Sequence, residues 1–452
     1  MSCAGTRRKA LFFTLSLSVA TPAALVACGG SDDAPVAQTP GPPPNPSPGP
    51  TPPPPPPPIP PPPTPAPPVP PTPAPPPPPP AAPFEVNIGS STPSAPPTGV
   101  VPILVQLPAA LNTPWALAFL ADGRMLVTQK GGSLVLVSAD GATVSPPITG
   151  VPAVDSSGQG GLLDVALDPQ FSLASNRRIY LAYSQPAGGG MNRTAVARAD
   201  LTADLAALQN VTVIFQQTPP KASSGHYGSR ILFRSDGTMF VTLGERQGFA
   251  SEAQQLTSQL GKVVRINRDS GSIPADNPFA SMGGNAAAVW SYGHRNPQAA
   301  AIHPTTGDLW VTEHGPQGGD EVNLALASRN FGWPNVSYGC NYGDPVGTTC
   351  RIGGGVHNTP YTAPLAFWYP ASTAPGGAMF YTGARFPEWQ GNFFVGGLAG
   401  RTLYRFVLNG NAIASHEPLF FNQHEIRDLK QGPDGWIYFL SRNANRIYRI
   451  ER

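Results

Sequence analysis

One pattern of polar and apolar positions recurs along the chain after about residue 100: a polar turn, then a short run of β-branched and aromatic residues. The six copies begin at Asp122, Asn176, Asp236, Thr306, Gln390 and Asp434. Within the copies, apolar residues alternate with a period of two, which is typical of β-strands. Because the copies are 44 to 84 residues apart, they fit four-stranded units with long loops better than a solenoid.

Further strands are predicted between the copies, for example over residues 133–137 and 446–450. Long amphipathic helical patterns are nearly absent, and residues 201–208 form the best short helical candidate. The predicted fold is therefore all-β, a six-bladed β-propeller of four-stranded antiparallel sheets, with a two-sheet sandwich as the alternative. In the propeller, the segment from Leu104 supplies the first strands and a strand near Ile447 closes the ring.

Proline is concentrated before this repeating region, with 32 of the 60 prolines between Pro35 and Pro83. Proline lacks a backbone donor and fixes φ, so this stretch cannot form a sheet ladder and favours polyproline II. We expect residues 28–100 to form a lipidated N-terminus and a disordered proline-rich linker, and residues 101–452 to form the propeller. The linker would hold the folded domain away from a membrane or act as a passive spacer.

The first 27 residues have the features of a secretory signal peptide of the lipoprotein type. Basic residues at positions 7–9 precede an apolar run over 11–19, which is too short for a comfortable membrane span. The sequence Leu-Val-Ala-Cys ending at Cys28 resembles a bacterial lipobox, in which the cysteine becomes the lipidated first residue. We therefore expect an exported, periplasmic or cell-surface protein, anchored to a bacterial membrane by lipid at Cys28. An ordinary cleavage site beside an incidental cysteine is the alternative.

Charged residues make up only 12% of the chain, and the formal net charge is +2. Without a basic excess there is no electrostatic basis for holding nucleic acid. With Cys3 assigned to the signal peptide and Cys28 to the lipid, Cys340 and Cys350 remain in a loop rich in Gly, Asn and Thr. In an oxidising compartment we expect these two cysteines to form a disulfide.

Candidate chemistry lies in four insertions between the repeats, over residues 158–164, 224–230, 290–298 and 313–323. His226 is a loop histidine of the kind that serves as a general base, although local sequence alone favours a structural histidine. Arg295 and Asn296 would either bind an anion or hold a turn. The fourth insertion combines carboxylates at 320 and 321 with carbonyls at 315–316, oxygen ligands that suit calcium, but it lacks EF-hand spacing.

Together the insertions resemble the pyrroloquinoline quinone (PQQ)-dependent soluble glucose dehydrogenases, and most closely their aldose sugar dehydrogenase branch. The resemblance covers roughly residues 112–450, and its most specific stretches are 226–230, 260–266, 273–279, 290–298, 313–323 and 330–334. Several such blocks in the family's order are a specific signal. The family's fold is a six-bladed propeller, which agrees with the fold predicted from the repeats alone.

The resemblance implies roles for residues around the quinone. His226 matches the general base that takes the proton of the sugar C1 hydroxyl while hydride passes to quinone C5. Arg295 matches the arginine that stabilises the negative charge developing on the quinone oxygen. Asn296 and Gln159 would contact the cofactor, and Glu245 stands where the family has an acid that pairs with the arginine.

The resemblance also implies calcium. The backbone carbonyls of Gly315 and Pro316 would hold a calcium ion that polarises the quinone as a Lewis acid, with Asp320 beside it. Glu321 and the carbonyl of Phe331 look like ligands of a second, structural calcium ion.

One departure from the family concerns the residues that bind the cofactor carboxylates. The glucose-active branch uses a lysine and arginines from later blades, but residues 377–382 contain no lysine here. Arg385, Arg401 and Arg427 are candidates for this pairing, and we select Arg401 as a cofactor contact. A solvated surface arginine is the alternative for each of them.

The predicted function is PQQ- and calcium-dependent oxidation of aldoses at C1 to lactones, with electrons passed to an external acceptor such as a periplasmic cytochrome. A non-catalytic sugar- or protein-binding propeller is one alternative, and the presence of both His226 and Arg295 argues against it. A calcium-dependent lactonase-type hydrolase is the other, since propellers support several chemistries. Its signature would be several carboxylates and an asparagine converging on one calcium ion.

Overall fold

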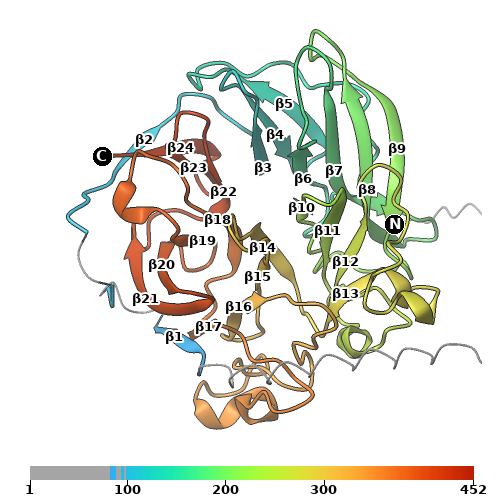
Figure 1. Cartoon of the computed structure of the whole chain (residues 1–452), viewed down its shortest axis with the longest axis vertical. Helices are drawn as coiled ribbons and strands as arrows, with labels where there is room; N and C mark the ends of the chain where they lie inside the picture. Colours follow the sequence, from blue (N-terminus) through green and yellow to red (C-terminus); the bar gives the residue numbers. More distant parts are fainter. Residues whose placement is uncertain (1–81, 88–92, 96–97) are drawn as a thin grey trace, which may run out of the picture. The chain divides into compact units, whose positions relative to one another are not determined.

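The computed structural model describes residues 82–87, 93–95 and 98–452, and its strands form six small sheets (Figure 1). The first three sheets contain β3 (Pro114–Phe119), β4 (Met125–Gln129) and β5 (Ser133–Val137); β6 (Leu162–Leu167), β7 (Arg178–Pro186), β8 (Asn192–Leu201) and β9 (Leu208–Gln216); and β10 (Ile231–Phe233), β11 (Thr238–Leu243), β12 (Lys262–Asn267) and β13 (Val289–Tyr292).

The other three sheets contain β14 (Pro297–Ile302), β15 (Leu309–Glu313), β16 (Asp320–Leu324), β17 (Ala366–Tyr369) and β1 (Phe84–Asn87); β18 (Pro375–Phe380), β19 (Phe393–Gly397), β20 (Leu403–Asn409) and β21 (Ala412–Leu419); and β22 (Ile426–Gln431), β23 (Ile437–Ser441), β24 (Arg446–Glu451) and β2 (Ile103–Gln106). The helices of the described residues are short 3₁₀ turns: η1 (Ala250–Gln254), η2 (Ala280–Met282), η3 (Ala286–Ala288), η4 (Thr348–Cys350), η5 (Ile352–Gly355) and η6 (Pro387–Trp389).

The six sheets close into a ring. The first strand of each sheet contacts the first strand of the next, in the order β3, β6, β10, β14, β18 and β22, and β22 contacts β3 again. Apolar side chains from neighbouring sheets fill the spaces between them; Trp310 and Phe393, for example, have ring centroids 5.1 Å apart across one such space. The prediction of a six-bladed β-propeller is confirmed, and the sandwich alternative is wrong.

The sequence repeats correspond to one hairpin per blade. Each of the six copies spans the turn between the first and second strands of a sheet and the second strand itself, from β4 to β23. The ring is closed by β2, which pairs antiparallel with β24 so that Leu104 lies opposite Ile450. Closure therefore joins the two ends of the folded region in one sheet, as the strands near Leu104 and Ile447 predicted.

Three details differ from the prediction. The first sheet has three strands, and the fourth has five because β1 adds to β17 in parallel. Residues 201–208 form no helix: they end β8, turn, and begin β9. Their leucines at 201, 205 and 208 imitate a helical stripe because all three are buried in the core under the turn, where Leu205 takes a positive φ of 61°.

The two ends of the propeller are different. Because the first two strands of each sheet are antiparallel, the loop before the first strand and the loop after the second lie at the same end. All four candidate insertions lie at this end, which we call the mouth. The opposite end carries short turns whose carboxylates are satisfied locally: Asp122 accepts from the backbone of Arg124 at 3.1 Å, and Asp236 from Thr238 at 2.9 Å.

Bulges occur in the first strands where they begin at the mouth. In β3, β14, β18 and β22 one residue is skipped in the pairing with the second strand. The skipped residues are Trp115, Gln298, Gly376 and Arg427. A bulge leaves its extra residue out of the ladder and changes the direction of its side chain. In these four blades, one residue at the mouth is therefore set apart from the regular strand pairing.

Arg230, directly before β10, ties the blades together at the centre of the ring. It reaches the carboxylates of Asp164 and Asp428, the carbonyls of Gln298, Gly376 and Arg427, and the ring of Trp115. These partners come from all five other sheets. Both ion pairs measure 3.0 Å and are almost completely buried. We call Arg230 with Asp164 and Asp428 the central hub.

The predicted signal peptide, the lipidated Cys28 and the proline-rich stretch up to residue 81 lie outside the described residues. The domain boundary at residue 101 stays a prediction, while the described segment β1 (Phe84–Asn87) pairs with the propeller. Within the described ranges, no helix has the length and apolar character needed to cross a bilayer.

Candidate functional site

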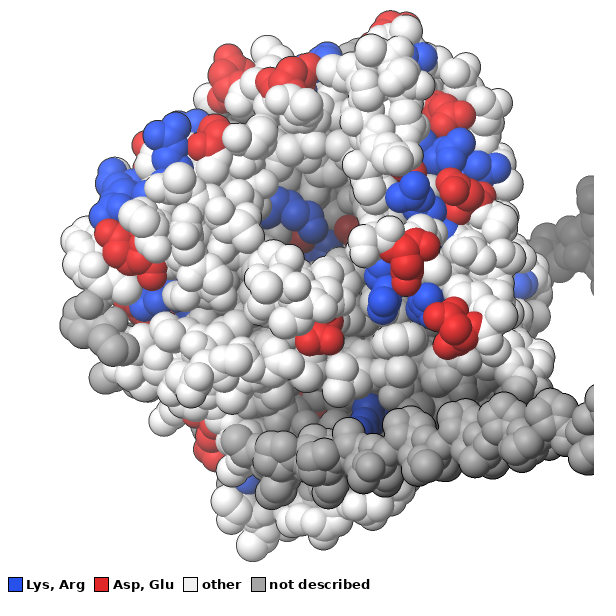
Figure 2. Space-filling view, viewed as in Figure 1, with Lys and Arg blue, Asp and Glu red and all other residues white. Residues whose placement is uncertain are grey.

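A cavity of about 390 Å³ opens at the mouth, within the size range of small-molecule sites. Part of its wall repeats from blade to blade: the bulge residues Trp115, Gln298 and Arg427, and the residues directly after the second strands, Lys130, His314, Leu398 and Arg442. Gly158 and Gln159 complete one side. Figure 2 shows that the face in view is hollowed at its centre and that basic side chains lie within the hollow.

His226, Arg295 and Asn296 are not among the residues that line this cavity, but His226 is held next to Gln159, which lines it, and two contacts fix its position. Its backbone N–H donates to Oε1 of Gln159 at 2.9 Å, and its Nδ1 lies 2.7 Å from Oε1 of Glu245. A carboxylate only accepts, which assigns the proton of the neutral ring to Nδ1 and leaves Nε2 as the proton acceptor. Burial, together with the positive charge of Arg295, lowers the pKa of His226 below its usual 6.5, despite the opposing effect of Glu245.

The backbone at His226 is held in an uncommon conformation. His226 has a positive φ of 47°, a region that residues other than glycine seldom occupy. A Cβ on Gly244 would come within 2.2 Å of the carbonyl oxygen of His226, so only glycine allows this approach. The close approach of Gly244, directly after β11, thus holds His226 in this conformation. Such constrained backbone conformations are common at functional sites.

Arg295 is positioned by a buried network that the sequence did not reveal. Its backbone N–H donates to Glu313 Oε2 at 2.6 Å, and the other oxygen of Glu313 contacts His294 Nδ1 at 2.8 Å. His294 Nε2 in turn lies 2.9 Å from the hydroxyl of Ser291. This Ser-His-Glu chain is inaccessible to substrate, because all three residues are almost fully buried. We infer that it orients Arg295 and performs no hydrolysis.

The guanidinium of Arg295 lies over the ring of Trp333 at 5.2 Å. It donates to the carbonyl of Gly315 at 2.7 Å and to the hydroxyl of Tyr342 at 3.2 Å. The backbone carbonyl of Arg295 also accepts from the N–H of Glu245 at 2.9 Å, which links it to the partner of His226. The structure therefore brings His226, Glu245 and Arg295 together.

Several buried polar atoms in this group have no protein partner. They are Oε2 of Glu245, Nε of Arg295 and Nδ2 of Asn296. Asn296 uses only its oxygen, which accepts from the N–H of Gly228 at 3.2 Å. Buried groups are normally satisfied, so unpartnered donors and acceptors beside a cavity indicate a polar ligand.

The residues suggested for calcium lie next to Arg295. The Gly315 carbonyl accepts from Arg295, the Pro316 carbonyl accepts from Ser372 at 3.2 Å, and Asp320 accepts from the N–H of Gly315 at 2.7 Å. Burial raises the pKa of Asp320 to about 6. Among the residues described, no cluster of three or more His, Cys, Asp or Glu side chains could hold a metal ion.

Glu321 and Phe331 line a separate cavity of about 10 Å³, together with Gly315. Burial, and then repulsion from Glu313, raises the pKa of Glu321 well above its usual value. The buried oxygen Oδ1 of Asn323, whose amide lies 3.3 Å from Glu321, has no partner. The cavity is the size of one water or ion, and its lining includes the carboxylates of Glu313 and Glu321 as well as Arg295.

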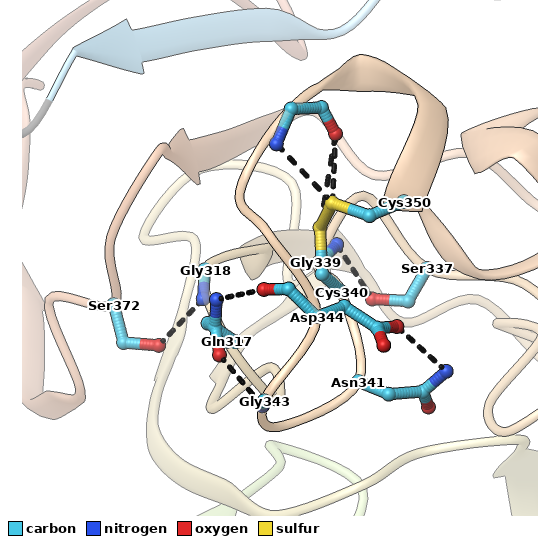
Figure 3. The surroundings of a disulfide bond; sticks show 11 residues. Gln317, Gly318, Ser337, Gly339, Cys340, Asn341, Gly343, Asp344, Cys350 and Ser372 are labelled. Atoms are coloured by element: carbon cyan, nitrogen blue, oxygen red, sulfur yellow. Dashed lines mark hydrogen bonds between the residues drawn. A yellow bond between two sulfur atoms is a disulfide. The ribbon is translucent and has the colours of Figure 1, made fainter.

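Cys340 and Cys350 are joined by a disulfide with their Cα atoms 5.1 Å apart. Gln317 fastens the loop between them to the fourth insertion, donating to the carbonyl of Asp344 at 2.9 Å and accepting from the N–H of Gly343 at 3.2 Å (Figure 3). Tyr342, the partner of Arg295, lies in this loop. The disulfide loop therefore forms part of the rim around Arg295.

The three arginines suggested for the cofactor have different positions. Arg427 lines the cavity. Arg385 stacks on Trp436, 4.8 Å from the ring, beside a turn at the opposite end of the propeller. Arg401 donates to the carbonyl of Gln423 at 3.1 Å and is not among the cavity-lining residues, so its assignment as a cofactor contact stays a prediction.

Lys130, His314 and Arg442 line the cavity but were not predicted from the sequence. A signal for them was present in the repeats. When the second strands are aligned, Lys130, His314, Leu398 and Arg442 occupy the same position, the first residue after the strand. This repeat position lines the cavity in four of the six blades, while the equivalent residues Ala187 and Gly244 do not line it. One known lining residue would therefore have suggested the others.

The chain is similar to proteins of one known family. A profile of the glucose/sorbosone dehydrogenase family matches residues 111–449. The aldose sugar dehydrogenase YliI of Escherichia coli strain K12 is 39% identical over 359 residues, which cover 78% of this chain and 93% of that protein.

Two solved structures have a similar fold. The apo form of the soluble aldose sugar dehydrogenase of E. coli superposes with a TM-score of 0.72 at 36% identity, over 78% of this chain and 99% of the other. The PQQ-bound aldose sugar dehydrogenase of Streptomyces coelicolor gives a TM-score of 0.64 at 26% identity, over 79% of this chain and 99% of the other.

Proposed function

Because this chain belongs to the glucose/sorbosone dehydrogenase family, we propose that it is a PQQ- and calcium-dependent aldose sugar dehydrogenase. It oxidises aldoses at C1 to lactones. The observation that carries this proposal is the contact of His226 with the side chain of Glu245, whose backbone N–H donates to the carbonyl of Arg295. His226 also bonds to Gln159, which lines the cavity at the mouth.

The residues at the mouth fit PQQ. PQQ is a flat, tricarboxylated quinone, and the cavity offers a mixed polar and apolar wall with basic side chains. Nε of Arg295 and Nδ2 of Asn296 are buried donors without protein partners, as a site for a polar ring system requires. Gln159, Arg295 and Asn296 would hold the cofactor. When bound, it supplies the hydride acceptor.

His226 acts as the general base of this reaction. Its Nε2 would take the proton of the C1 hydroxyl while the hydrogen on C1 leaves as hydride, so the sugar loses one proton and one hydride, two electrons and two protons in all, and becomes the lactone. Glu245 keeps the proton on Nδ1 and stabilises the imidazolium that forms. Arg295 places a positive charge where negative charge develops, and its anchored backbone costs no reorganisation at that moment.

Calcium fits the oxygen donors on this chain. Each carbonyl oxygen has two lone pairs, so those of Gly315 and Pro316 keep one after their bonds to Arg295 and Ser372. An ion held there, with Asp320 beside it, would supply Lewis-acid polarisation. Glu321 and the Phe331 carbonyl would hold a second, structural ion, whose charge would relieve the repulsion between two buried carboxylates.

The wider setting follows from the sequence. We place the enzyme outside the cytoplasm, anchored by lipid at Cys28, with the proline-rich segment as a tether. The electrons leave to an external acceptor such as a periplasmic cytochrome. The disulfide between Cys340 and Cys350 suits an oxidising compartment.

The test is reconstitution of the purified chain with PQQ and calcium, followed by an aldose and an electron-accepting dye. We expect a sugar-dependent reduced-quinone spectrum and dye turnover. His226→Gln should lose turnover by about 10²–10⁴-fold while still binding the quinone. The matched control is Arg124→Gln, which changes an exposed turn at the opposite end and should leave turnover unchanged. Full turnover in His226→Gln would refute the base.

The same experiment separates the alternatives. A wild-type chain that binds the sugar but shows no quinone spectrum would indicate a binding propeller. Hydrolysis of a lactone without quinone would indicate the hydrolase.

A further inference from the structure

Arg246 follows Glu245 directly in the chain and is completely buried. It does not line the mouth cavity, yet its guanidinium bonds to the loop that carries His226. Its Nε donates to the carbonyl of Gly225 at 3.0 Å, and its Nη2 donates to the carbonyl of Ser223 at 2.5 Å. A buried guanidinium needs acceptors for its donors, and Arg246 finds two of them in the three residues before the proposed base.

The backbone of Arg246 supports the same loop. Its N–H donates to the carbonyl of His226 at 3.2 Å, at the residue whose backbone has a positive φ of 47°. Residues other than glycine rarely take such a φ, and they keep it only where the surrounding contacts hold them. Three carbonyl groups within residues 223–226 therefore accept from one residue.

The guanidinium of Arg246 is also fixed to the second blade. It donates to the backbone carbonyl of Asn192 at 3.3 Å and to the side-chain oxygen of Asn192 at 2.5 Å, at the start of β8. It lies over the ring of Tyr227 at 3.8 Å, and the amide of Asn192 donates to the carboxylate of Asp155 at 2.6 Å. Arg246 thus connects the loop of His226, which precedes the third blade, with the second blade.

Arg246 and Glu245 act on the charge of His226 in opposite directions. Burial lowers the pKa of His226, Glu245 raises it, and the positive charges of Arg295 and Arg246 lower it. The charge of His226 also acts on His314, whose pKa burial lowers to about 3, so that His314 is neutral at neutral pH. The charge of Arg246 therefore favours the unprotonated form of His226.

We propose that Arg246 is a positioning residue for the general base, which holds residues 223–226 so that the imidazole of His226 stays against Glu245 with its Nε2 free. This assignment rests on the proposed function. A lysine at position 246 would keep the positive charge, but it lacks the fork of donors that reaches the carbonyls of Gly225 and Ser223 together. Substitution can therefore separate the effect of the hydrogen bonds from the effect of the charge.

The first test measures kcat and KM for an aldose as a function of pH, in the full chain reconstituted with PQQ and calcium. The number of active sites is counted by PQQ titration, so that unfolded molecules do not contribute. Arg246→Lys should lower kcat about 10–10²-fold with little change in KM, because a displaced base affects the chemical step more than binding. The acid limb of its kcat/KM profile should stay at the wild-type pH.

Arg246→Met removes the charge as well as the hydrogen bonds. We expect a similar loss of kcat, and the acid limb should move to higher pH because a cation that lowers the pKa of His226 is gone. The matched control is Arg265→Met, a buried arginine of β12 that pairs with Asp236 at 3.1 Å and Asp276 at 3.0 Å. It should lower the melting temperature but keep the wild-type kcat per active site and the wild-type acid limb.

Two outcomes of these measurements would overturn the proposal. One is a wild-type kcat in Arg246→Lys. The other is an equal loss of kcat per active site in Arg265→Met, which would make the effect a general consequence of removing a buried arginine.

A second readout does not depend on the quinone. In the chain labelled with ¹⁵N-histidine, which contains seven histidines, the ring signals of His226 are those missing from His226→Gln. In both Arg246 variants, the shifts of the neutral ring should move toward the average of the two tautomers, because the loop no longer holds Nδ1 against Glu245. The pKa of His226 should rise in Arg246→Met and stay at the wild-type value in Arg246→Lys.

The two readouts separate this proposal from the proposed function. If the wild type oxidises no aldose but the ring signals of His226 change as expected, the proposed function fails and the positioning of His226 by Arg246 stands. If the wild type is active and both Arg246 variants keep its kcat and its His226 signals, the positioning role is overturned while the proposed function stands.

Discussion

One buried arginine and a group of three basic residues lie close together in this propeller, and their surroundings differ. In the central hub, Arg230 pairs with two buried carboxylates and donates to three backbone carbonyls. In the wall of the mouth cavity, Lys130, Arg427 and Arg442 accompany a single carboxylate, Glu425, which pairs with Arg442. Arg230 has its counterions within the protein, whereas the cavity wall has more cations than carboxylates among its lining residues.

This difference distinguishes charged residues that stabilise the fold from charged residues that are available to a ligand. A buried ion needs partners in either case. Where the protein supplies the counterions, as it does for Arg230, removing the charged side chain leaves those counterions unpaired and lowers the free energy of unfolding. Where it leaves charges in excess, removal relieves repulsion and costs affinity for the ligand instead.

The largest expected effect is at the hub. Arg230→Met removes the cation that Asp164 and Asp428 share and leaves only Lys430, 3.6 Å from Asp428, so we expect the free energy of unfolding to fall by about 3–5 kcal/mol in urea titrations followed by circular dichroism. Adding Asp164→Asn and Asp428→Asn to this variant should restore part of the loss. If Arg230→Met alone loses less than about 1 kcal/mol, the hub is not a structural centre.

Glu245→Gln tests whether Glu245 sets the tautomer of His226. The amide can donate to Nδ1 of His226 and so stabilise the wrong tautomer, and we expect kcat to fall by about 10²–10⁴-fold with little loss of stability. Glu388→Gln, which alters a surface pair with Arg452, is the control and should keep wild-type kcat. Equal kcat values for the two variants would contradict the role of Glu245.

The pH dependence of kcat/KM tests the role of His226, because nearby arginines act on the charge of its imidazole. The groups that act on its charge are Glu245, Arg295 and Arg246. Since burial and the arginines lower its pKa, the neutral base persists to more acidic pH, and the acid limb of kcat/KM should fall below pH 6.5. Glu245→Gln removes the group that raises the pKa and should move this limb further to acid. A limb above 6.5 would argue against His226 as the base.

The smallest effect is expected for the stability of Arg442→Gln. Its side chain is 54% exposed and pairs with Glu425 at the surface, so the free energy of unfolding without ligand should change by less than about 1 kcal/mol. The measurement is the urea titration used for Arg230→Met. A loss as large as that of the hub variant would make Arg442 a structural residue and remove the contrast between the two groups.

Much of the architecture was predictable from the sequence because the repeats encode it. A turn followed by period-two alternation identifies the second strand of each blade, and six copies give six blades. The loops with candidate chemistry were predictable for the same reason, as they interrupt the repeat. The helical expectation for residues 201–208 was wrong because a hairpin turn buries leucines at spacings that imitate one face of a helix.

The site was predictable in part. The structure brings together His226, Gln159, Glu245 and Arg295, which the family resemblance had selected from three separate insertions and, for Glu245, from the segment after β11. Arg401 was selected without knowledge of its register, and its guanidinium contacts the carbonyl of Gln423 instead of lining the cavity. The network from Ser291 to Glu313 could not be predicted, because a hydrogen bond between different strands depends on their register.

The sequence by itself determined the number of blades, the strands that form them and the loops that carry chemistry, because these follow from local alternation and turn residues. Only the tertiary structure decided which charges are paired. Arg230 and Arg427 look alike along the chain, yet one lies between two carboxylates and the other faces a cavity. The energy of a charge depends on what surrounds it in space, and closure of the ring sets those surroundings by bringing the first blade against the last.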